Sequence, residues 1–378
     1  MASKTEGNFE GPIRITPALK RAAGVAINRV LKTKRGERVL IVANPPRDAR
    51  TISLALYNAA AEAGARPTLV IQPTKKQMDM AEDAVIYAMR SEPEIIISVS
   101  TLKMGKDHFA MRKSYRVGGK SIEHVFNYLK ASKRMRGFWS PSVTIPMFEE
   151  TVPIDYRKLA RNAGALKAVF DRAVGAHITS KLGTDLMLGF RGRKAFTDDG
   201  DFSRPGTGGN LPAGEMYISP ELGSGEGTLV FDGCISSDRG VIIIREPIRT
   251  VVKKNLITAI TGGSEAKCLR ETLERARTNT RKFAAAGQIP KQELSEYLKN
   301  VCNLGELGIG LNEKARIVGN MLEDEKVFKT CHIAIGSNYD DDGKALIHLD
   351  GLVTNPTIVA MDAAGRKTVV LDNGRIVV

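Results

Sequence analysis

The sequence lacks a long apolar run and a secretion signal. No apolar segment in its 378 residues reaches the ~20 residues that a bilayer-spanning helix needs. The first seven residues, Met1–Gly7, lack the apolar core of a signal peptide. We therefore expect a cytoplasmic protein without a membrane segment.

Cysteine pairs and nucleotide-binding glycine motifs are also missing. Cys234, Cys268, Cys302 and Cys331 form no C-x-x-C pair, which argues against a zinc ribbon or a thioredoxin-like motif. Their wide spacing predicts free, mostly buried thiols. Neither G-x-G-x-x-G nor a Walker loop occurs, and the first predicted strand is followed by Asn44-Pro45-Pro46. A nucleotide-dependent dehydrogenase or kinase is therefore disfavoured.

The chain has an excess of basic residues without a recognisable nucleic-acid motif. Its 56 Lys and Arg residues against 42 Asp and Glu residues give a formal net charge of +14. This charge permits binding to nucleic acid or to an anionic membrane. The basic residues are spread out, however, and no zinc finger, aromatic RNA-binding strand motif or basic G-x-x-G clamp is present. We expect a basic surface that attracts acidic substrates and does not bind nucleic acid.

The first half alternates between short apolar runs and segments with helical spacing of apolar residues. This alternation predicts an α/β domain over residues 1–190, with a parallel sheet covered on both faces. The expected strands are 38–44, 67–73 and 94–100, and the expected helices are 16–31, 49–63, 78–90 and 155–173.

The second half has a different texture, which predicts a mixed α+β, strand-rich domain over residues 191–378. The segment 197–228 is dense in Gly and Pro, and such segments within compact domains are usually functional loops. The Asn373-Gly374 pair predicts a terminal hairpin. Further expected strands are 228–232, 241–244 and 249–252, and the expected helices are 264–285 and 292–301.

Two of the five histidines fall close together near the C-terminus. His332 lies in the apolar run 330–336, and His348 precedes Asp350 by two residues. On a strand, residues i and i+2 point to the same side, so His348 and Asp350 would face one point. These donors suit zinc, manganese, cobalt or ferrous iron. Alternatively, His332 is a satisfied core histidine and Asp350 a turn residue. The other histidines are expected on the surface or in the core: His108, His124 and His177.

Two glutamates occupy comparable apolar or Gly-rich surroundings. Glu215 is the only acid in 209–220, and Glu306 is the only acid in 303–312. A buried carboxylate needs a cation or strong hydrogen bonds, although either glutamate alone is also compatible with a surface or hydrogen-bonded position. Together with the histidines, they favour a metal site. Cys331, next to His332, would point away from the metal.

These segments resemble the aminopeptidase T family of metallopeptidases, the thermophilic-type leucyl aminopeptidases. The family motifs are N-[IL]-P-x-x-E-x-[FY], a downstream glutamate, H-I-A-x-G and H-x-D. The resemblance covers residues 200–360, and before them it rests on the strand–helix pattern alone. It implies metal ligation by Glu215, Glu306, His332, His348 and Asp350, with Tyr339 as the catalytic tyrosine.

The resemblance implies a hydrolase that removes N-terminal residues from peptides. Two zinc, cobalt or manganese ions ~3.5–4 Å apart would be bridged by a carboxylate and a water, and would lower the pKa of that water toward ~7. Glu306 and Tyr339 would act in catalysis, and the Tyr339 hydroxyl would donate a hydrogen bond to the oxyanion. A homodimer is also implied.

The sequence departs from this family at several positions. Lys329 stands where the family has glycine, Leu349 stands where an aromatic residue is usual, and Asp340-Asp341-Asp342 makes the loop after Tyr339 acidic. The acidic loop is interpreted as a solvated turn. These differences are compatible with a changed substrate.

Two other functions remain open. The same fold family is similar to ferrous-iron dioxygenases that open dihydroxypyridine rings. In that case His332, His348 and Asp350 would form a two-histidine, one-carboxylate triad, and the glutamates would support the ligands or contact the substrate. The third alternative is a non-catalytic basic binding protein with a structural metal.

Overall fold

The computed structural model describes residues 11–76 and 79–378, and the chain divides into two compact units. Unit 1 contains Met1–Tyr156 and Gly200–Ala213, and unit 2 contains Arg157–Asp199 and Gly214–Val378. The domain boundary expected at residue 190 stays a prediction.

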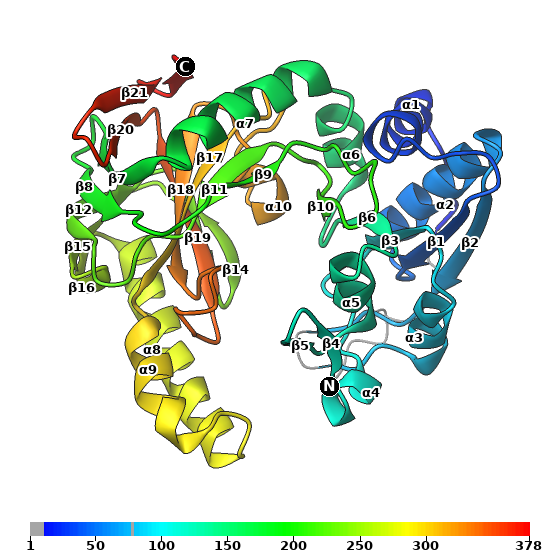
Figure 1. Cartoon of the computed structure of the whole chain (residues 1–378), viewed down its shortest axis with the longest axis horizontal. Helices are drawn as coiled ribbons and strands as arrows, with labels where there is room; N and C mark the ends of the chain where they lie inside the picture. Colours follow the sequence, from blue (N-terminus) through cyan, green and yellow to red (C-terminus); the bar gives the residue numbers. More distant parts are fainter. Residues whose placement is uncertain (1–10, 77–78) are drawn as a thin grey trace. The chain divides into compact units, whose positions relative to one another are not determined.

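Unit 1 is built on a five-stranded sheet with the order β10-β6-β3-β1-β2, in which every neighbouring pair is parallel (Figure 1). Every residue of β3 is buried, as expected for a strand covered on both faces. The predicted parallel α/β sheet is confirmed. Its strands are β1 (Arg38–Ala43), β2 (Arg66–Ile71), β3 (Ile95–Val99), β6 (Arg136–Trp139) and β10 (Gly208–Asn210).

The helices of unit 1 follow local sequence signals. Thr16 caps α1 by accepting a hydrogen bond from the Leu19 amide at 3.0 Å, and Pro17 occupies the first helical position. The helix expected from Met78 begins at Asp83, and Met78 itself lies outside the described residues. The helices are α1 (Pro17–Val25), the π-helix η1 (Ala26–Val30), α2 (Arg47–Glu62), α3 (Asp83–Arg90), α4 (His108–Arg112), α5 (Val125–Ala131) and α6 (Ile145–Thr151); β4 (Tyr115–Val117) and β5 (Lys120–Ile122) form a small hairpin.

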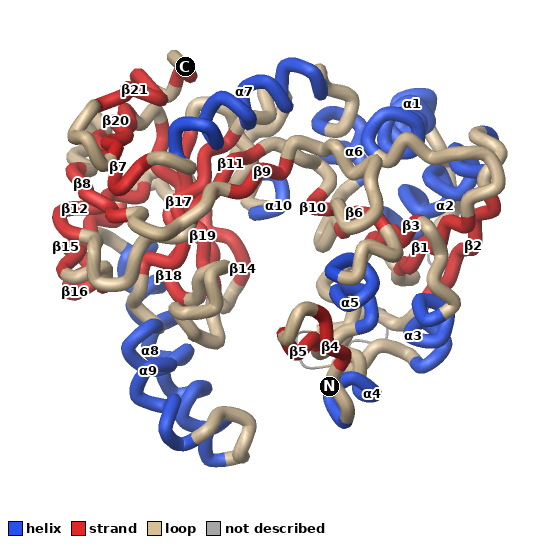
Figure 2. Tube along the Cα trace, viewed as in Figure 1, coloured by secondary structure: helices blue, strands red, loops and turns tan. Residues whose placement is uncertain are grey.

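Unit 2 contains two antiparallel sheets, with the orders β14-β13-β19-β18-β17-β11-β9 and β16-β15-β12-β8-β7-β20-β21-β22 (Figure 2). The predicted strand-rich character is confirmed. The strands are β7 (Ala173–Thr179), β8 (Asp185–Gly189), β9 (Phe196–Asp198), β11 (Glu215–Ile218), β12 (Glu226–Phe231), β13 (Cys234–Ser237), β14 (Gly240–Ile243), β15 (Ile248–Lys253), β16 (Leu256–Thr261), β17 (Leu304–Gly310), β18 (Thr330–Gly336), β19 (His348–Thr354), β20 (Thr357–Asp362), β21 (Lys367–Asp372) and β22 (Arg375–Ile376).

The helices of unit 2 are α7 (Tyr156–Phe170), α8 (Ser264–Ala285), η2 (Lys291–Glu293), α9 (Leu294–Asn300) and α10 (Met321–Asp324). The first residue of α7, Tyr156, is the last residue of the first segment of unit 1. The helix predicted over 264–285 is confirmed at both ends. Asn373 and Gly374 both have positive φ between β21 and β22, which confirms the terminal hairpin. The four cysteines are free, and in the described part of the chain no helix has the length and apolar character to cross a bilayer.

Candidate metal centre

Four adjacent strands of the seven-stranded sheet bring the sequence-predicted ligands together. Glu215 begins β11, Glu306 lies on β17, His332 on β18, and His348 and Asp350 on β19. The strand order β19-β18-β17-β11 makes these elements direct neighbours. The side chains gather because the five positions face the same side of the sheet.

Glu306 lies at the centre of the cluster. One of its oxygens is 3.4 Å from His332 Nε2, and the other is 3.0 Å from His348 Nε2. Asp350 Oδ1 is 3.2 Å from His348 Nε2, and Glu215 Oε2 is 3.5 Å from His332 Nε2. Adjacent ligands of a transition metal with bonds of ~2.1 Å lie ~3 Å apart, so these spacings fit metal binding.

The donors form two overlapping groups that share Glu306. Within each group, ligand atoms lie within 4.8 Å of one another. One group contains Glu215, Glu306 and His332, and the other contains Glu306, His348 and Asp350. A buried site of imidazoles and carboxylates that can hold a metal ion is therefore present in unit 2.

Gly308 makes room for the His332 imidazole. The two residues are register partners on β17 and β18, and a Cβ atom at Gly308 would lie 2.0 Å from His332 Nε2. A side chain of any size at this position would displace the imidazole. The glycine that the sequence analysis noted only as part of a Gly-rich stretch is thus required by the site.

Burial and ion pairing shift the pKa values of the candidate ligands. Burial disfavours the charged imidazole of His332, but the hydrogen bond and charge of Glu306 outweigh it and raise its pKa to about 9. Burial of Asp350 is likewise outweighed by the charge of His348, which lowers the pKa of Asp350 to about 2. Without a metal, protonated histidines therefore balance the carboxylates, and a divalent ion would replace those protons.

Hydrogen bonding prepares His348 for ligation. Its Nδ1 lies 2.9 Å from the Ser337 carbonyl oxygen, so Nδ1–H donates and Nε2 keeps its lone pair for a metal. Asp350 Oδ1 has no hydrogen-bond partner among residues 11–76 and 79–378, although it is buried. A buried carboxylate oxygen 3.2 Å from an imidazole nitrogen that loses its proton on metal binding is an arrangement that a cation would satisfy.

Lys326 is part of the centre, although the sequence analysis did not identify it. Its fully buried ammonium lies 2.5 Å from Glu215 Oε1, 2.6 Å from Glu325 Oε1 and 4.0 Å from Asp198 Oδ2. Burial raises the pKa of Glu325 to about 8. The charge of Lys326 lowers this pKa, but the negative charges of Glu215 and Asp350 raise it together with burial. The Asp324-Glu325-Lys326 run was the available signal, but nothing in it indicates that a lysine is buried.

Tyr339 lies beside the cluster. Its ring centroid is 5.4 Å from that of His348 and 5.1 Å from that of Tyr217, and about half of the residue is exposed. Its backbone amide donates to Ser219 Oγ at 3.2 Å. Tyr217, which the sequence analysis did not single out as a functional residue, thus forms an aromatic wall with Tyr339 at the site.

The acidic loop after Tyr339 is held by an arginine. Arg193 contacts Asp342 at 2.7 Å and Asp340 at 3.7 Å. Its side chain is 10% exposed, so these two aspartates are tied to the protein and the turn is not fully solvated.

The remaining histidines and Cys331 do not join the metal groups found among the described residues. His177, on the half-buried strand β7, pairs with Asp185 at 2.6 Å, and His108 lies 3.4 Å from Asp83. His124 accepts a hydrogen bond from the Phe126 amide at 3.0 Å. Cys331 alternates with His332 along β18 and so faces the other side of the sheet, as expected.

Residues 147–332 match the model of a family described as NicX, 2,5-dihydroxypyridine 5,6-dioxygenase. A curated 2,5-dihydroxypyridine 5,6-dioxygenase of Pseudomonas putida KT2440 is 32% identical over 120 residues, which are 30% of this chain and 33% of the relative. The match therefore spans about a third of the length of that relative.

Two solved structures share the fold along nearly the whole chain. The 2,5-dihydroxypyridine dioxygenase of P. putida KT2440 superposes with a TM-score of 0.70 and 19% identity, covering 95% of this chain and 96% of that chain. Wild-type AmpT from Thermus thermophilus has a TM-score of 0.64 and 16% identity, covering 96% and 99%.

The expected membership of the aminopeptidase T family is wrong, and so are the hydrolase and protease activities that it implied. The matching family model and the curated relative are dioxygenases, whereas the similarity to AmpT concerns the fold. The error has a physical reason. Both solved structures share the fold of this chain, and imidazole and carboxylate ligands suit zinc, manganese and ferrous iron alike.

Proposed function

We propose that this protein is a ring-cleaving dioxygenase that uses ferrous iron and acts on a small dihydroxylated heteroaromatic compound of the 2,5-dihydroxypyridine type. The observation that carries the proposal is the buried cluster around Glu306 and His332. Glu215, Glu306 and His332 lie within residues 147–332, which match the dioxygenase family, and His348 and Asp350 follow that segment. Such a substrate is a small molecule. The homodimer expected from the sequence stays a prediction.

The residues present fit ferrous iron. Two imidazoles with neighbouring carboxylates are a donor set that suits a non-haem iron with positions left for other ligands. We assign ligation to Glu306, His348 and Asp350, with His332, which lies next to the other oxygen of Glu306, as the second imidazole ligand. Lys326 would hold Glu215 through Oε1 and leave Oε2 directed at His332.

Ferrous iron held by these residues would provide the redox centre through which electrons of the aromatic ring reach dioxygen, so that the ring is oxidised as both oxygen atoms enter it. The chain would orient that ring. Tyr217 and Tyr339 offer aromatic faces for stacking, and the hydroxyl of the half-exposed Tyr339 can donate a hydrogen bond to a hydroxyl oxygen of the substrate. The buried carboxylates and Lys326 would hold a fixed electrostatic field around the reacting ring.

Oxygen uptake by the iron-loaded enzyme tests the proposal. Protein purified without oxygen is loaded with ferrous iron and mixed with 2,5-dihydroxypyridine, and oxygen consumption and loss of ring absorbance are followed. We expect both atoms of isotopically labelled oxygen in the opened product. Zinc-loaded protein should be inactive, because zinc has no redox chemistry.

Matched histidine variants locate the reaction. His348→Ala should abolish oxygen uptake and lower the iron content. His177→Ala should retain both, because His177 pairs with Asp185 on β7, outside the metal groups. Full activity of His348→Ala, or absence of oxygen uptake by fully iron-loaded wild-type protein with dihydroxypyridines, would contradict the proposal.

A further inference from the structure

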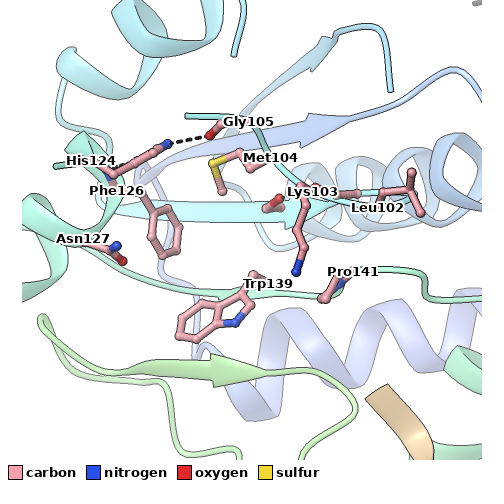
Figure 3. Close-up of a pocket in the computed structure, with 11 residues that line it drawn as sticks. Leu102, Lys103, Met104, Gly105, His124, Phe126, Asn127, Trp139 and Pro141 are labelled. Carbon is pink, nitrogen blue, oxygen red and sulfur yellow. Dashed lines mark hydrogen bonds between the residues drawn. The ribbon is translucent and has the colours of Figure 1, made fainter. Parts of the chain in front are cut away.

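Unit 1 contains a cavity of about 310 Å³ at the carboxyl ends of β3 and β6 (Figure 3). Open parallel α/β sheets bind ligands outside the carboxyl ends of their strands. The volume lies at the lower end of the ~300–1,000 Å³ that is typical of small-molecule pockets. A molecule with a single ring therefore suits it.

The cavity has an aromatic wall. Trp139 ends β6, and its ring meets that of Phe126 edge to face, with centroids 5.6 Å apart. Figure 3 shows both rings at the cavity, with the Met104 side chain nearby. Aromatic and thioether groups favour a planar aromatic ligand.

The charge at the cavity is positive. Figure 3 shows the Lys103 side chain at the cavity, directed toward Trp139. The Lys103 ammonium has no ion-pair or hydrogen-bond partner within residues 11–76 and 79–378. Lys130 Nζ lies 4.5 Å from the centroid of the Trp139 ring. None of the described residues that line the cavity is acidic. An anionic group on the ligand would complement this charge.

His124 belongs to the wall but carries no charge there. Its Nδ1 accepts from the Phe126 amide, and its Nε2 donates to the Gly105 carbonyl oxygen at 3.2 Å. Burial lowers its pKa, which keeps the imidazole neutral. Among the residues that line the cavity, Lys103 therefore provides the positive charge that can bind an anion.

A pair of buried hydroxyls provides a polar anchor. Ser98 Oγ and Ser100 Oγ lie 2.8 Å apart at the end of β3, and both residues are at most 5% exposed. Because one proton is used within the pair, the other hydroxyl proton is available to a ligand oxygen.

We propose that this cavity binds a small planar aromatic carboxylate, with its ring against Trp139 and Phe126 and its carboxylate at Lys103. The cavity shares no residue with the metal centre. The proposal does not rest on the metal chemistry, so it can be tested on metal-free protein.

The chain contains a single tryptophan, and this residue lines the cavity, so its fluorescence reports on binding. Metal-free full-length protein is titrated with benzoate while the emission of Trp139 is recorded. Benzamide, which has the ring without the charge, and cyclohexanecarboxylate, which has the charge without aromaticity, serve as comparison ligands. We expect a saturable change with benzoate and affinities at least about fivefold weaker for the other two.

Variants connect the signal to the site. Lys103→Gln should weaken benzoate about fivefold and leave benzamide unchanged. Lys113→Gln, which removes the same charge from an exposed position away from the cavity, should have no effect. His348→Ala should also leave the titration unchanged, because its position belongs to the metal centre.

Three outcomes would overturn the proposal. They are the absence of saturation with benzoate, equal affinity of Lys103→Gln and wild type for benzoate, and loss of the signal in His348→Ala. Oxygen uptake by the iron-loaded enzyme is a separate measurement, so failure here would leave the proposed dioxygenase activity standing.

Discussion

Replacing Lys326 with methionine removes a fully buried ammonium and leaves its acidic neighbours without that counter-charge. In the native protein the ammonium lies within 4.0 Å of carboxylate oxygens of Glu215, Glu325 and Asp198. Methionine fills similar space but carries no charge. The variant therefore isolates the electrostatic contribution of this side chain.

Removing one partner of a buried ion pair typically costs ~3–5 kcal/mol, because the remaining charge stays buried without compensation. We expect Lys326→Met to lower the free energy of unfolding by about this amount in metal-free protein. Lys158→Met, which breaks an exposed pair of 2.6 Å with Glu313, should cost less than ~1 kcal/mol. Adding Glu215→Gln to Lys326→Met should recover part of the loss, since the carboxylate that lies 2.5 Å from the ammonium in the native protein is then replaced by a neutral amide.

Urea denaturation followed by far-ultraviolet circular dichroism measures these differences, because the signal includes the two sheets of unit 2. Metal is removed first with a chelator, so that ligand binding does not mask the loss. If Lys326→Met cost no more than the exposed Lys158→Met, or if Glu215→Gln gave no recovery, the reasoning about a buried charge network would be refuted.

Three further predictions concern the metal centre. Gly308→Ala should lower metal affinity at least tenfold by displacing His332, whereas Gly164→Ala on an open helix surface should not lower it. Competition with a chromophoric chelator measures both affinities. Unchanged affinity in Gly308→Ala would show that His332 is not a ligand. Since the pKa of His332 is about 9, its imidazole is protonated at pH 7. Metal uptake should therefore release at least about one proton, and metal affinity should rise as the pH increases toward 9. Calorimetry in buffers of different ionisation enthalpy tests this, and a pH-independent affinity would contradict it. Arg193→Gln should lower kcat/KM about tenfold at unchanged iron content, because the substitution removes the ion pairs that hold the loop carrying Tyr339. An unchanged kcat/KM would show that this loop does not position the substrate.

The sheets were predictable where one sequence signal dominates. In β3, five successive residues are buried, so a continuous apolar run indicates a strand of a covered parallel sheet. The ends of the helix 264–285 were also predicted correctly, since Gly262 and Gly263 precede it and Gly287 and Pro290 follow it. The route of the chain was not predictable. Residues 200–213 return to unit 1, and β10 pairs with β6 there, although no local pattern encodes so distant a partner.

The gathering of the candidate ligands also depends on strands that are distant in the sequence, β11, β17, β18 and β19, but here the sequence carried a usable signal. Isolated acids in apolar stretches, such as Glu306, and histidines in apolar strands require a compensating partner. That requirement predicts a shared site without specifying its register. Lys326 gave no such signal, because a lysine after two acidic residues is typical of an exposed turn. Its burial follows from packing beside β11, where Glu215 accepts its hydrogen bond.

The reaction could not be predicted from the ligand pattern, and the structure explains this limit. Glu306 belongs to both metal groups, so the same side chain can serve a single ion or bridge two. The ligands are therefore compatible with hydrolytic and with oxidative chemistry, and the distinction lies in the residues around them and in the metal that is supplied. In this chain those residues include Tyr217, Tyr339 and an acidic loop fixed by Arg193. A half-exposed tyrosine beside His348 suits an incoming planar ring, and this is the property that oxygen-uptake measurements with hydroxylated heteroaromatic compounds would examine.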